Sequence, residues 1–590
     1  MRSERGRVFL SNGITSALEL SGVVDWFPCP RFDSASVFSS IIGGNQSGYF
    51  SVKPKTDYEH SVEYVEDSMV VKNRFESKEG SLELTDFLPL GIPAIVRLYE
   101  SEVPFVIDVK PVFEYGLTNP GIEEENNGRV FRNPNSKESI ELLISGSFRF
   151  TSDTRAVVEP GKGYLFLMYS KDLRYGLFSN VGYVYANPYD ALEKTLRYWR
   201  EQVMKAKKIE EFSKAYKRSL LTMLGLTYTP SGGAIAAATT SLPEILGGDR
   251  NWDYRYVWVR DAAYAAEALA KAGMGYKARK ILTFLFSLVD PSSKSFNHPL
   301  YSIDGTSPRA EETLDWLSGY RSSKPVRVGN AAYLQVQMDS EGDFMNALHV
   351  YFSRSRDTDY IKENWWAVES ISDWVIKSWK EPSISMWEER DEKRHVLHTK
   401  LMNWVALDRA SMLAGSMGYR SKESLWREAS NKIKEDILDN SVSEDTGTFV
   451  HYYGGNVIDS TLLTMPLYNF VSVENPIFRK TVRLVESRLV SKNGLLLRYV
   501  SDFDGEVSNP FVLVNTWLAR VHIMMGNLER ARSIINKIIS YSNDLLLLPE
   551  HIDSKTNEPR GNVPQLFSHA GLVEAIVAYN NAKAKSSFRP

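Results

Sequence analysis

The spacing of apolar positions divides the chain into two parts with different secondary structure. From Val8 to about Tyr185, short apolar runs such as AIVRLYE, FVIDVKPVF, SFRFTS and GYLFLMYS are separated by Gly, Pro, Asn and Asp residues. This pattern is typical of strands joined by turns. From Pro188 onward, apolar residues recur every three or four positions, which indicates helices. The chain is therefore predicted to fold as an antiparallel β domain followed by a helical part.

The helical part is predicted to begin with a connector and to continue as a ring of paired helices. The connector has an apolar face, so it should dock against the protein instead of forming a disordered linker. Eleven helices in the last 350 residues, joined by some long polar loops, favour a toroid over a four-helix bundle. The predicted helices cover residues 261–273, 276–289, 329–353, 358–379, 401–418, 422–438, 458–470, 475–489, 511–525, 527–541 and 565–582. The predicted domains are a β domain at 1–187, a helical linker at 188–240 and a helical domain at 241–590.

Composition and charge narrow the class of protein. With 590 residues, 43% of them hydrophobic and 24% charged, the chain is of the soluble globular kind and too long for one ordinary core. Its formal charge is −3, and Lys and Arg are spread along the sequence, so nucleic acid is not expected as a partner. Cys29 is the single cysteine, which excludes an intrachain disulfide. The N-terminus lacks an apolar signal region, and no run approaches the ~20 apolar residues of a membrane span. We expect a cytoplasmic protein without a membrane partner.

Aromatic and charged residues gather directly before the first helix of the predicted helical domain. The segment GGDRNWDYRYVWVRDAAYAAEAL places Arg260 and Asp261 at the helix start. In isolation such a pair is more often an N-cap with its ion partner. The aromatic residues around this pair favour a sugar site, because a guanidinium and a carboxylate within an aromatic wall can hold sugar hydroxyls. These aromatic residues are Trp252, Tyr254, Tyr256 and Trp258.

Two adjacent carboxylates, Glu388 and Glu389, follow Trp387 in the segment SMWEERDEKRHVLHTK. Neighbouring carboxylates repel and an indole lowers the local polarity, so one of them can keep its proton near neutrality and act as an acid. The commoner interpretation of EERDEKR alone is a solvated charge run before a helix. His395 and His398 lie three positions apart without a further clustered ligand, so no metal site is predicted there.

A third candidate, Glu550, comes immediately after the apolar run LLLLP. A carboxylate at the end of a buried segment is a candidate general base, because burial and neighbouring groups set its pKa. The same residue could equally be a partner for a helix or strand terminus. The adjacent Ser568 and His569 are no evidence of nucleophilic catalysis, since the members of a triad meet in space and not in sequence.

Together these three segments resemble glycoside hydrolase family 15, which contains glucoamylases, glucodextranases and microbial trehalases. The resemblance extends to LYSIDGTSP at 300–308, LSGYRSSKPVRVGNAAYLQVQMDSEGD at 317–343 and GLLLRYVSD at 494–502. At the other end, TSALELSGVVDWFPCPRFDSASVF at 15–38 is similar to the opening of the trehalase-like branch. The resemblance implies an N-terminal antiparallel β-super-sandwich, a helical linker and an (α/α)6 barrel.

The resemblance also implies roles for the carboxylates. WEE supplies the general acid at Glu388, with Trp387 among the substrate-binding residues and Glu389 lining the adjacent subsite. LPE supplies the general base at Glu550. The base loop reads PEHID, whereas many members of the family have Gln or Glu after the catalytic residue, so the orienting role is not assigned to His551.

YRYVWVRD matches the family's pattern for the terminal-glucose subsite. By this resemblance Arg260 and Asp261 bind hydroxyls, while Tyr254 and Trp258 shape the wall. Arg498, in LLRY, corresponds to a further substrate-binding arginine.

The resemblance implies an inverting, exo-acting hydrolase that releases glucose from an α-glucoside without a cofactor or metal. In such enzymes one carboxylic acid protonates the leaving oxygen while a carboxylate activates water on the opposite face of the sugar. Trehalose is favoured slightly as the substrate, and maltooligosaccharides, starch or related glucans are the alternative. The remoter alternatives are a phosphorylase, which needs no second carboxylate, and a non-catalytic sugar-binding protein, which would be expected to have lost Glu388 or Glu550.

Overall fold

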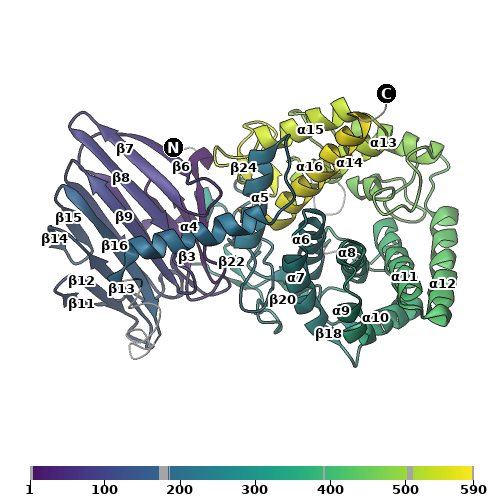
Figure 1. Ribbon diagram of the computed structural model, residues 1–590, viewed down its shortest axis with the longest axis horizontal. Coiled ribbons are helices and arrows are strands. Elements are labelled where there is room, and N and C mark those ends of the chain that lie inside the picture. The colour runs from purple at the N-terminus through teal and green to yellow at the C-terminus, as the bar shows by residue number, and fades with distance from the viewer. Residues whose placement is uncertain (1–3, 172–183, 185, 390–392, 501–508, 588–590) are drawn as a thin grey trace.

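The structure is a computed structural model that describes residues 4–171, 184, 186–389, 393–500 and 509–587. Two eight-stranded antiparallel sheets form the N-terminal part (Figure 1). The first sheet has the order β1-β2-β3-β5-β10-β15-β14 with β4 beside β3, and the second has the order β11-β12-β13-β16-β9-β8-β7-β6. Strands of the first sheet are β1 (Val8–Ser11), β2 (Ser16–Leu20), β3 (Val23–Pro28), β4 (Ser36–Phe38), β5 (Tyr49–Pro54), β10 (Phe105–Lys110), β14 (Phe148–Ser152) and β15 (Arg155–Val158). Strands of the second are β6 (Glu59–Tyr64), β7 (Val71–Ser77), β8 (Gly80–Phe87), β9 (Ala94–Ser101), β11 (Gly121–Glu125), β12 (Gly128–Arg132), β13 (Ser139–Ile144) and β16 (Gly161–Ser170).

The two sheets pack face to face around one apolar core. Val52 of β5 alternates with more exposed neighbours and shares this core with Leu84 of β8, as a strand with one buried face should. β9 is different, because nearly all of its residues are buried. Its second face, with Val96, is covered by helix α4 (Pro188–Met204), which contributes Leu196 (Figure 1). This double burial explains why apolar residues occupy consecutive positions at the start of AIVRLYE.

The helices after α4 pair into a closed ring. Among the described residues, α6, α8, α11, η6, α14 and α16 contact one another in sequence, and α16 returns to α6. The outer elements α7, α10, α12, α13, α15 and α5 each pack on a member of this ring. The elements are α5 (Ser213–Gly225), α6 (Val259–Lys271), α7 (Gly275–Ser287), α8 (Ser340–Ser355), α9 (Thr358–Glu363), α10 (Trp365–Ser378), α11 (Leu397–Met417), α12 (Arg420–Asn440), η6 (Ser460–Thr464), α13 (Pro476–Arg488), α14 (Val512–Met524), α15 (Leu528–Ser540) and α16 (Leu566–Ser587). The expected (α/α)6 barrel is confirmed, with a 3-10 helix as one inner member.

Three of the predicted helices differ in extent, and one of these, at 358–379, is divided into α9 and α10 at Asn364. The predicted helix at 329–353 begins only at Ser340, because the loop before it is drawn toward the barrel mouth by the buried Asn330, whose side chain bonds to Asp253 and Ala332. The predicted helix at 458–470 is reduced to η6, where Thr461 and Thr464 turn their hydroxyls to neighbouring groups of the chain instead of continuing a helix.

The boundaries at 187 and 240 stay predictions. α5 packs on α16, the last helix of the ring, which groups α5 with the barrel. None of the helices in the described ranges is long and apolar enough to span a bilayer.

Candidate active site

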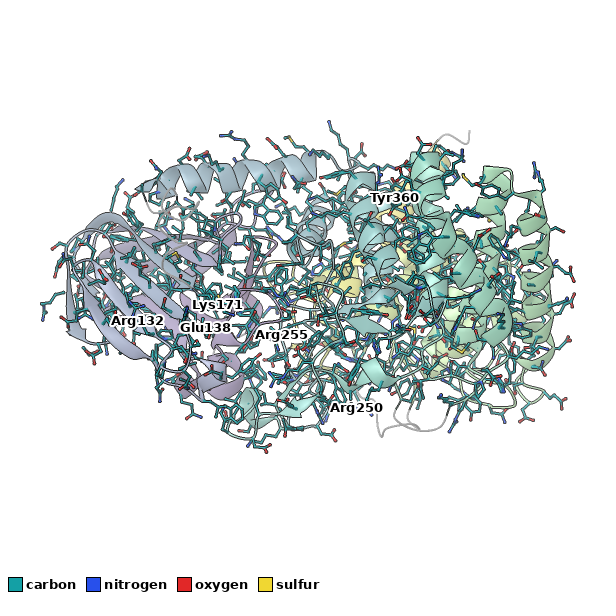
Figure 2. The ribbon with its side chains drawn as sticks, turned by 90° about the horizontal axis from the view of Figure 1, so that it is seen from below. Arg132, Glu138, Lys171, Arg250, Arg255 and Tyr360 are labelled. Carbon is teal, nitrogen blue, oxygen red and sulfur yellow. The ribbon has the colours of Figure 1, made fainter. Side chains whose placement is uncertain are left out.

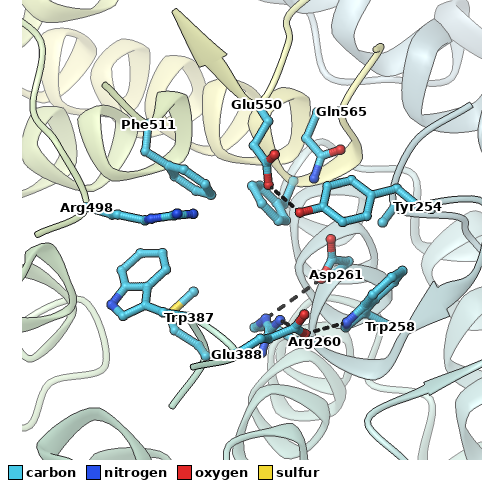
Figure 3. Close-up of a pocket in the computed structure, with 13 residues that line it drawn as sticks. Tyr254, Trp258, Arg260, Asp261, Trp387, Glu388, Arg498, Phe511, Glu550 and Gln565 are labelled. Carbon is cyan, nitrogen blue, oxygen red and sulfur yellow. Dashed lines mark hydrogen bonds and ion pairs between the residues drawn. The ribbon is translucent and has the colours of Figure 1, made fainter. Parts of the chain in front are cut away.

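A cavity, here called the inner cavity, lies where the loops that precede α6, α11, α14 and α16 converge. Eight of the nine predicted site residues line it (Figure 3). The lining residues are Ala236, Tyr254, Trp258, Arg260, Asp261, Met386, Trp387, Glu388, Arg498, Phe511, Glu550, Gln565 and Phe567. The fold thus brings together three segments that are more than a hundred residues apart in the sequence.

Glu388 stands on one side of the inner cavity with one of its carboxylate oxygens fully engaged. Its Oε1 accepts hydrogen bonds from Trp258 Nε1 at 2.6 Å, from Gln337 Nε2 at 3.1 Å and from Arg260 Nη2 at 3.3 Å. Within the described residues, no such bond reaches Oε2. The backbone at Glu388 has φ 59°, a left-handed conformation that is strained for a residue with a side chain and is often found at functional positions. The arrangement holds the carboxyl group in one orientation with Oε2 available.

Glu389 does not line the inner cavity, and its expected role in an adjacent subsite stays a prediction. Its carboxylate accepts hydrogen bonds from the Ser385 hydroxyl and lies 3.7 Å from His451 Nε2. His451 lies 3.1 Å from Asp459, and Trp387 Nε1 donates to Asp459 at 2.7 Å. Burial alone would lower the pKa of His451, but the carboxylates of Asp459 and Glu389 raise it to about 10. Through these contacts Glu389 helps to hold the loop that carries Glu388 in place.

Glu388 and Glu389 are not part of a solvated charge run, which was the commoner interpretation of EERDEKR. The side chain of Glu388 is 22% exposed and that of Glu389 only 7%. Residues 390–392 of the run lie outside the described residues. His395 is exposed and its ring stacks on Tyr453, whereas His398 is buried in α11.

Glu550 stands on the other side of the inner cavity, opposite Glu388 (Figure 3). Tyr254 donates a hydrogen bond of 3.0 Å from its hydroxyl to Oε1 of Glu550. Burial, together with the nearby charge of Glu244, raises the pKa of Glu550 well above its usual range, although Arg498 and Tyr254 oppose this. Gly561 packs so closely on the Glu550 carboxylate that a Cβ atom there would come within 3.1 Å of it. The glycine thus leaves room for the carboxylate, and the surroundings favour the protonated form of Glu550 more than water does.

Glu244 is a buried carboxylate beside Glu550 that the sequence did not single out. Arg498 Nη2 donates to its Oε2 at 2.9 Å. Burial alone would raise the pKa of Glu244, but the charge of Arg498 holds this pKa below its usual range. His551 Nε2 lies 3.6 Å from both Glu244 and Glu550. These three side chains are of metal-ligating types and lie close together. Arg498 already supplies the positive charge at Glu244, so we assign the cluster to the surroundings of the base.

Arg260 and Asp261 form the floor of the inner cavity. Arg260 bonds to Gln337 Oε1 at 3.0 Å and to Asp339 at 3.1 Å, and its Nε lies 3.8 Å from Asp261. The N-cap interpretation of Asp261 is wrong, because the N-cap of α6 is Trp258 and no side chain caps it. Burial raises the pKa of Asp261 to about 7, against the charge of Arg260. Arg260 is thus held by Gln337 and Asp339, which are not part of the cavity lining, and Asp261 lines the cavity.

The N-terminal domain anchors the loop that carries these residues. Arg255 pairs with Asp253 at 2.6 Å and donates to the carbonyl oxygen of Ser34 at 2.7 Å. Trp26 donates its indole N–H to the carbonyl oxygen of Ala238 at 2.8 Å. Figure 2 shows Arg255 between the sheets and the helices. The segment DWFPCPRFDS, which includes Trp26 and Ser34, therefore helps to place Tyr254 and Trp258.

A second and larger cavity, here called the outer cavity, adjoins the first. It has a volume of about 310 Å³ and shares Tyr254, Trp387, Glu388 and Arg498 with the inner cavity. Glu550 lines only the inner one. Its other lining residues are Glu244, Arg250, Trp252, Asn330, Ala331, Ala332 and Gln335. Glu388 therefore stands at the boundary between the two spaces.

Two known family patterns match the sequence of this chain. The pattern of Glycosyl hydrolases family 15 matches residues 210–577, and that of the domain described as "Trehalase-like, N-terminal" matches residues 2–167. The chain belongs to glycosyl hydrolase family 15. It is a glycoside hydrolase.

Curated relatives and a solved structure extend along almost the whole chain. Trehalase 2 of Sulfolobus acidocaldarius is 52% identical, over 97% of this chain and 99% of its own length. The trehalase of Mycolicibacterium smegmatis is 31% identical, over 96% of this chain and 90% of its own. A bacterial glucoamylase complexed with acarbose has a similar fold, with a TM-score of 0.77 at 14% identity over 98% of this chain and 94% of its own.

Proposed function

We propose that this family 15 enzyme hydrolyses trehalose, with Glu388 as the general acid and Glu550 as the general base. The observation that carries the catalytic roles is the position of the two carboxyl groups on opposite sides of the inner cavity (Figure 3). An inverting glycosidase needs this arrangement, because acid and water act on opposite faces of the sugar.

The proposed reaction places one glucose of the substrate in the inner cavity and the other in the outer cavity. Oε2 of Glu388, at the boundary, donates its proton to the glycosidic oxygen as the bond to the anomeric carbon breaks. Glu550 takes a proton from a water molecule, whose oxygen forms the new bond to that carbon from the opposite face. The glucose from the inner cavity leaves as the β-anomer, and the other leaves with its α configuration unchanged.

The floor and walls of the inner cavity support binding of a terminal glucose. Asp261 and Arg260 offer hydrogen bonds to hydroxyls, and the rings of Trp258 and Trp387 offer apolar surface to the C–H face of a pyranose. Arg498 reaches both cavities and can contact both glucose units. We therefore propose that all these residues bind substrate, and that Glu389 holds the acid loop in place.

Trehalose as the substrate rests on the relatives that are named trehalases, above all the one at 52% identity. Glucose release from trehalose, maltose, isomaltose and starch, measured in parallel, tests this. We expect trehalose to give the highest kcat/KM. Higher values for maltose and starch would make the enzyme a glucoamylase.

We also propose a cytoplasmic location for the enzyme. The single cysteine, Cys29, is buried and free, so the fold does not depend on an oxidising compartment. Cell fractionation with an antibody against the protein tests this, and recovery of the enzyme outside the cells would contradict it.

A further inference from the structure

The outer cavity contains a buried carboxylate for which the proposed mechanism has no use. Glu244 lines this cavity but not the inner one, and its side chain is 7% exposed. Burying a carboxylate costs free energy unless charges or hydrogen bonds compensate for it. Arg498 supplies that compensation through the bond of 2.9 Å.

Among the residues that the structure describes, the contacts of the Glu244 carboxylate are made by one of its two oxygens. Arg498, Arg250 and His551 all approach Oε2, at 2.9, 3.8 and 3.6 Å. Within the described residues, no hydrogen bond to Oε1 is made. An ionised carboxylate has about four acceptor positions, so with respect to the described residues Glu244 keeps acceptor capacity on Oε1.

The surroundings of Glu244 hold it rigidly. The Asn509 side chain donates to the carbonyl oxygen of Glu244 at 2.6 Å, and the backbone N–H of Glu244 donates to the carbonyl oxygen of Arg250 at 3.3 Å. Trp252, which lines the same cavity, has the guanidinium of Arg327 4.5 Å from its ring centre. The outer cavity thus has a fixed acceptor and an aromatic ring, the two features that bind a sugar.

We propose that Glu244 is a specificity residue that accepts hydrogen bonds from hydroxyl groups of the leaving glucose in the outer cavity. This inference rests on the proposed function, which places the leaving sugar there. Because Arg498 joins Glu244 and also lines the inner cavity, occupation of the outer cavity is linked to the alignment of the scissile bond. Glu244 therefore contributes to the cleavage of substrates whose leaving group is a sugar and little to the cleavage of those whose leaving group is not.

The test compares two substrates that share the inner cavity and differ in the leaving group. α-Glucosyl fluoride carries no second sugar, whereas trehalose does. For Glu244→Gln, the ratio of kcat/KM on trehalose to kcat/KM on α-glucosyl fluoride should fall about tenfold or more, as expected for a lost hydrogen bond to a charged group. Each substrate is measured at its own optimum pH, so that a change in the ionisation of Glu550 cancels from the ratio. Asp249→Asn, in the same loop but outside both cavities, is the matched control and should leave the ratio unchanged.

An unchanged ratio in folded Glu244→Gln would overturn the inference. If both activities were kept, Glu244 would have no role in cleavage, and if both fell equally, Glu244 would act only through the base. If this variant does not fold, Glu244→Asp keeps the charge but shortens the side chain, and the same fall in the ratio is expected. Failure of the proposed function looks different. The wild type would then cleave another disaccharide, such as maltose, but not trehalose, and the ratio with that disaccharide would still test Glu244.

Discussion

The hydroxyl of Tyr254 donates a hydrogen bond of 3.0 Å to Oε1 of Glu550, from a loop that the N-terminal domain holds through Arg255. This bond orients the base and stabilises its ionised form. Tyr254→Phe should therefore lower kcat about tenfold, the usual cost of losing a bond to a charged acceptor. Tyr256→Phe removes a neighbouring buried hydroxyl outside the inner cavity and serves as the control. Equal kcat values in the two variants would show that the bond has no role in the reaction.

The acid and the base should respond differently to the leaving group. Glu388→Gln cannot protonate a glycosidic oxygen, so we expect kcat on trehalose to fall by orders of magnitude while hydrolysis of α-glucosyl fluoride, whose leaving group needs no proton, is largely kept. Glu550→Gln cannot activate water and should lose both activities. Thermal unfolding of both variants checks that the fold is intact. The opposite pattern would exchange the two roles.

The environment of Glu550 predicts how the rate depends on pH. Burial and the charge of Glu244 raise the pKa of Glu550, and a general base must be ionised to work. The value of kcat/KM should therefore fall as the pH drops through this raised pKa, at a higher pH than the ~4.3 of an ordinary Glu. Glu244→Gln removes the negative charge, so it should move the acid limb of the profile to lower pH. Asp249→Asn should not move it, and a limb that stays in place in Glu244→Gln would contradict the assigned cause.

Much of the fold and the residues around the inner cavity could be predicted from the sequence. Strand and helix periodicity separated the sheets from the barrel, and the aromatic, acidic and arginine residues stood out because they lie in loops that lead into helices. The roles of Glu388 and Glu550, in contrast, came from the resemblance to the family. Local patterns alone left each of them with a structural alternative.

The residues that the sequence did not reveal are those whose partners lie far along the chain. Glu244 meets Arg498 across 254 positions, and Gln337 reaches Glu388 across 51. His451 and Asp459 carry no local motif, and only the fold places them behind Trp387 and Glu389. Glu389 was placed in a subsite by the resemblance to the family, whereas its carboxylate accepts a hydrogen bond from Ser385 and lies 3.7 Å from His451.

The configuration of the first glucose released from trehalose tests the central claim most directly, because it reports on which face of the sugar the water attacks. Proton NMR of the anomeric region is recorded in the first minutes of hydrolysis, before mutarotation mixes the anomers. If Glu388 protonates the leaving oxygen and Glu550 activates water on the opposite face, the initial signals of α- and β-glucose are equal. Initial release of α-glucose alone would mean that the configuration is retained through a covalent intermediate, and it would contradict the roles assigned to Glu388 and Glu550.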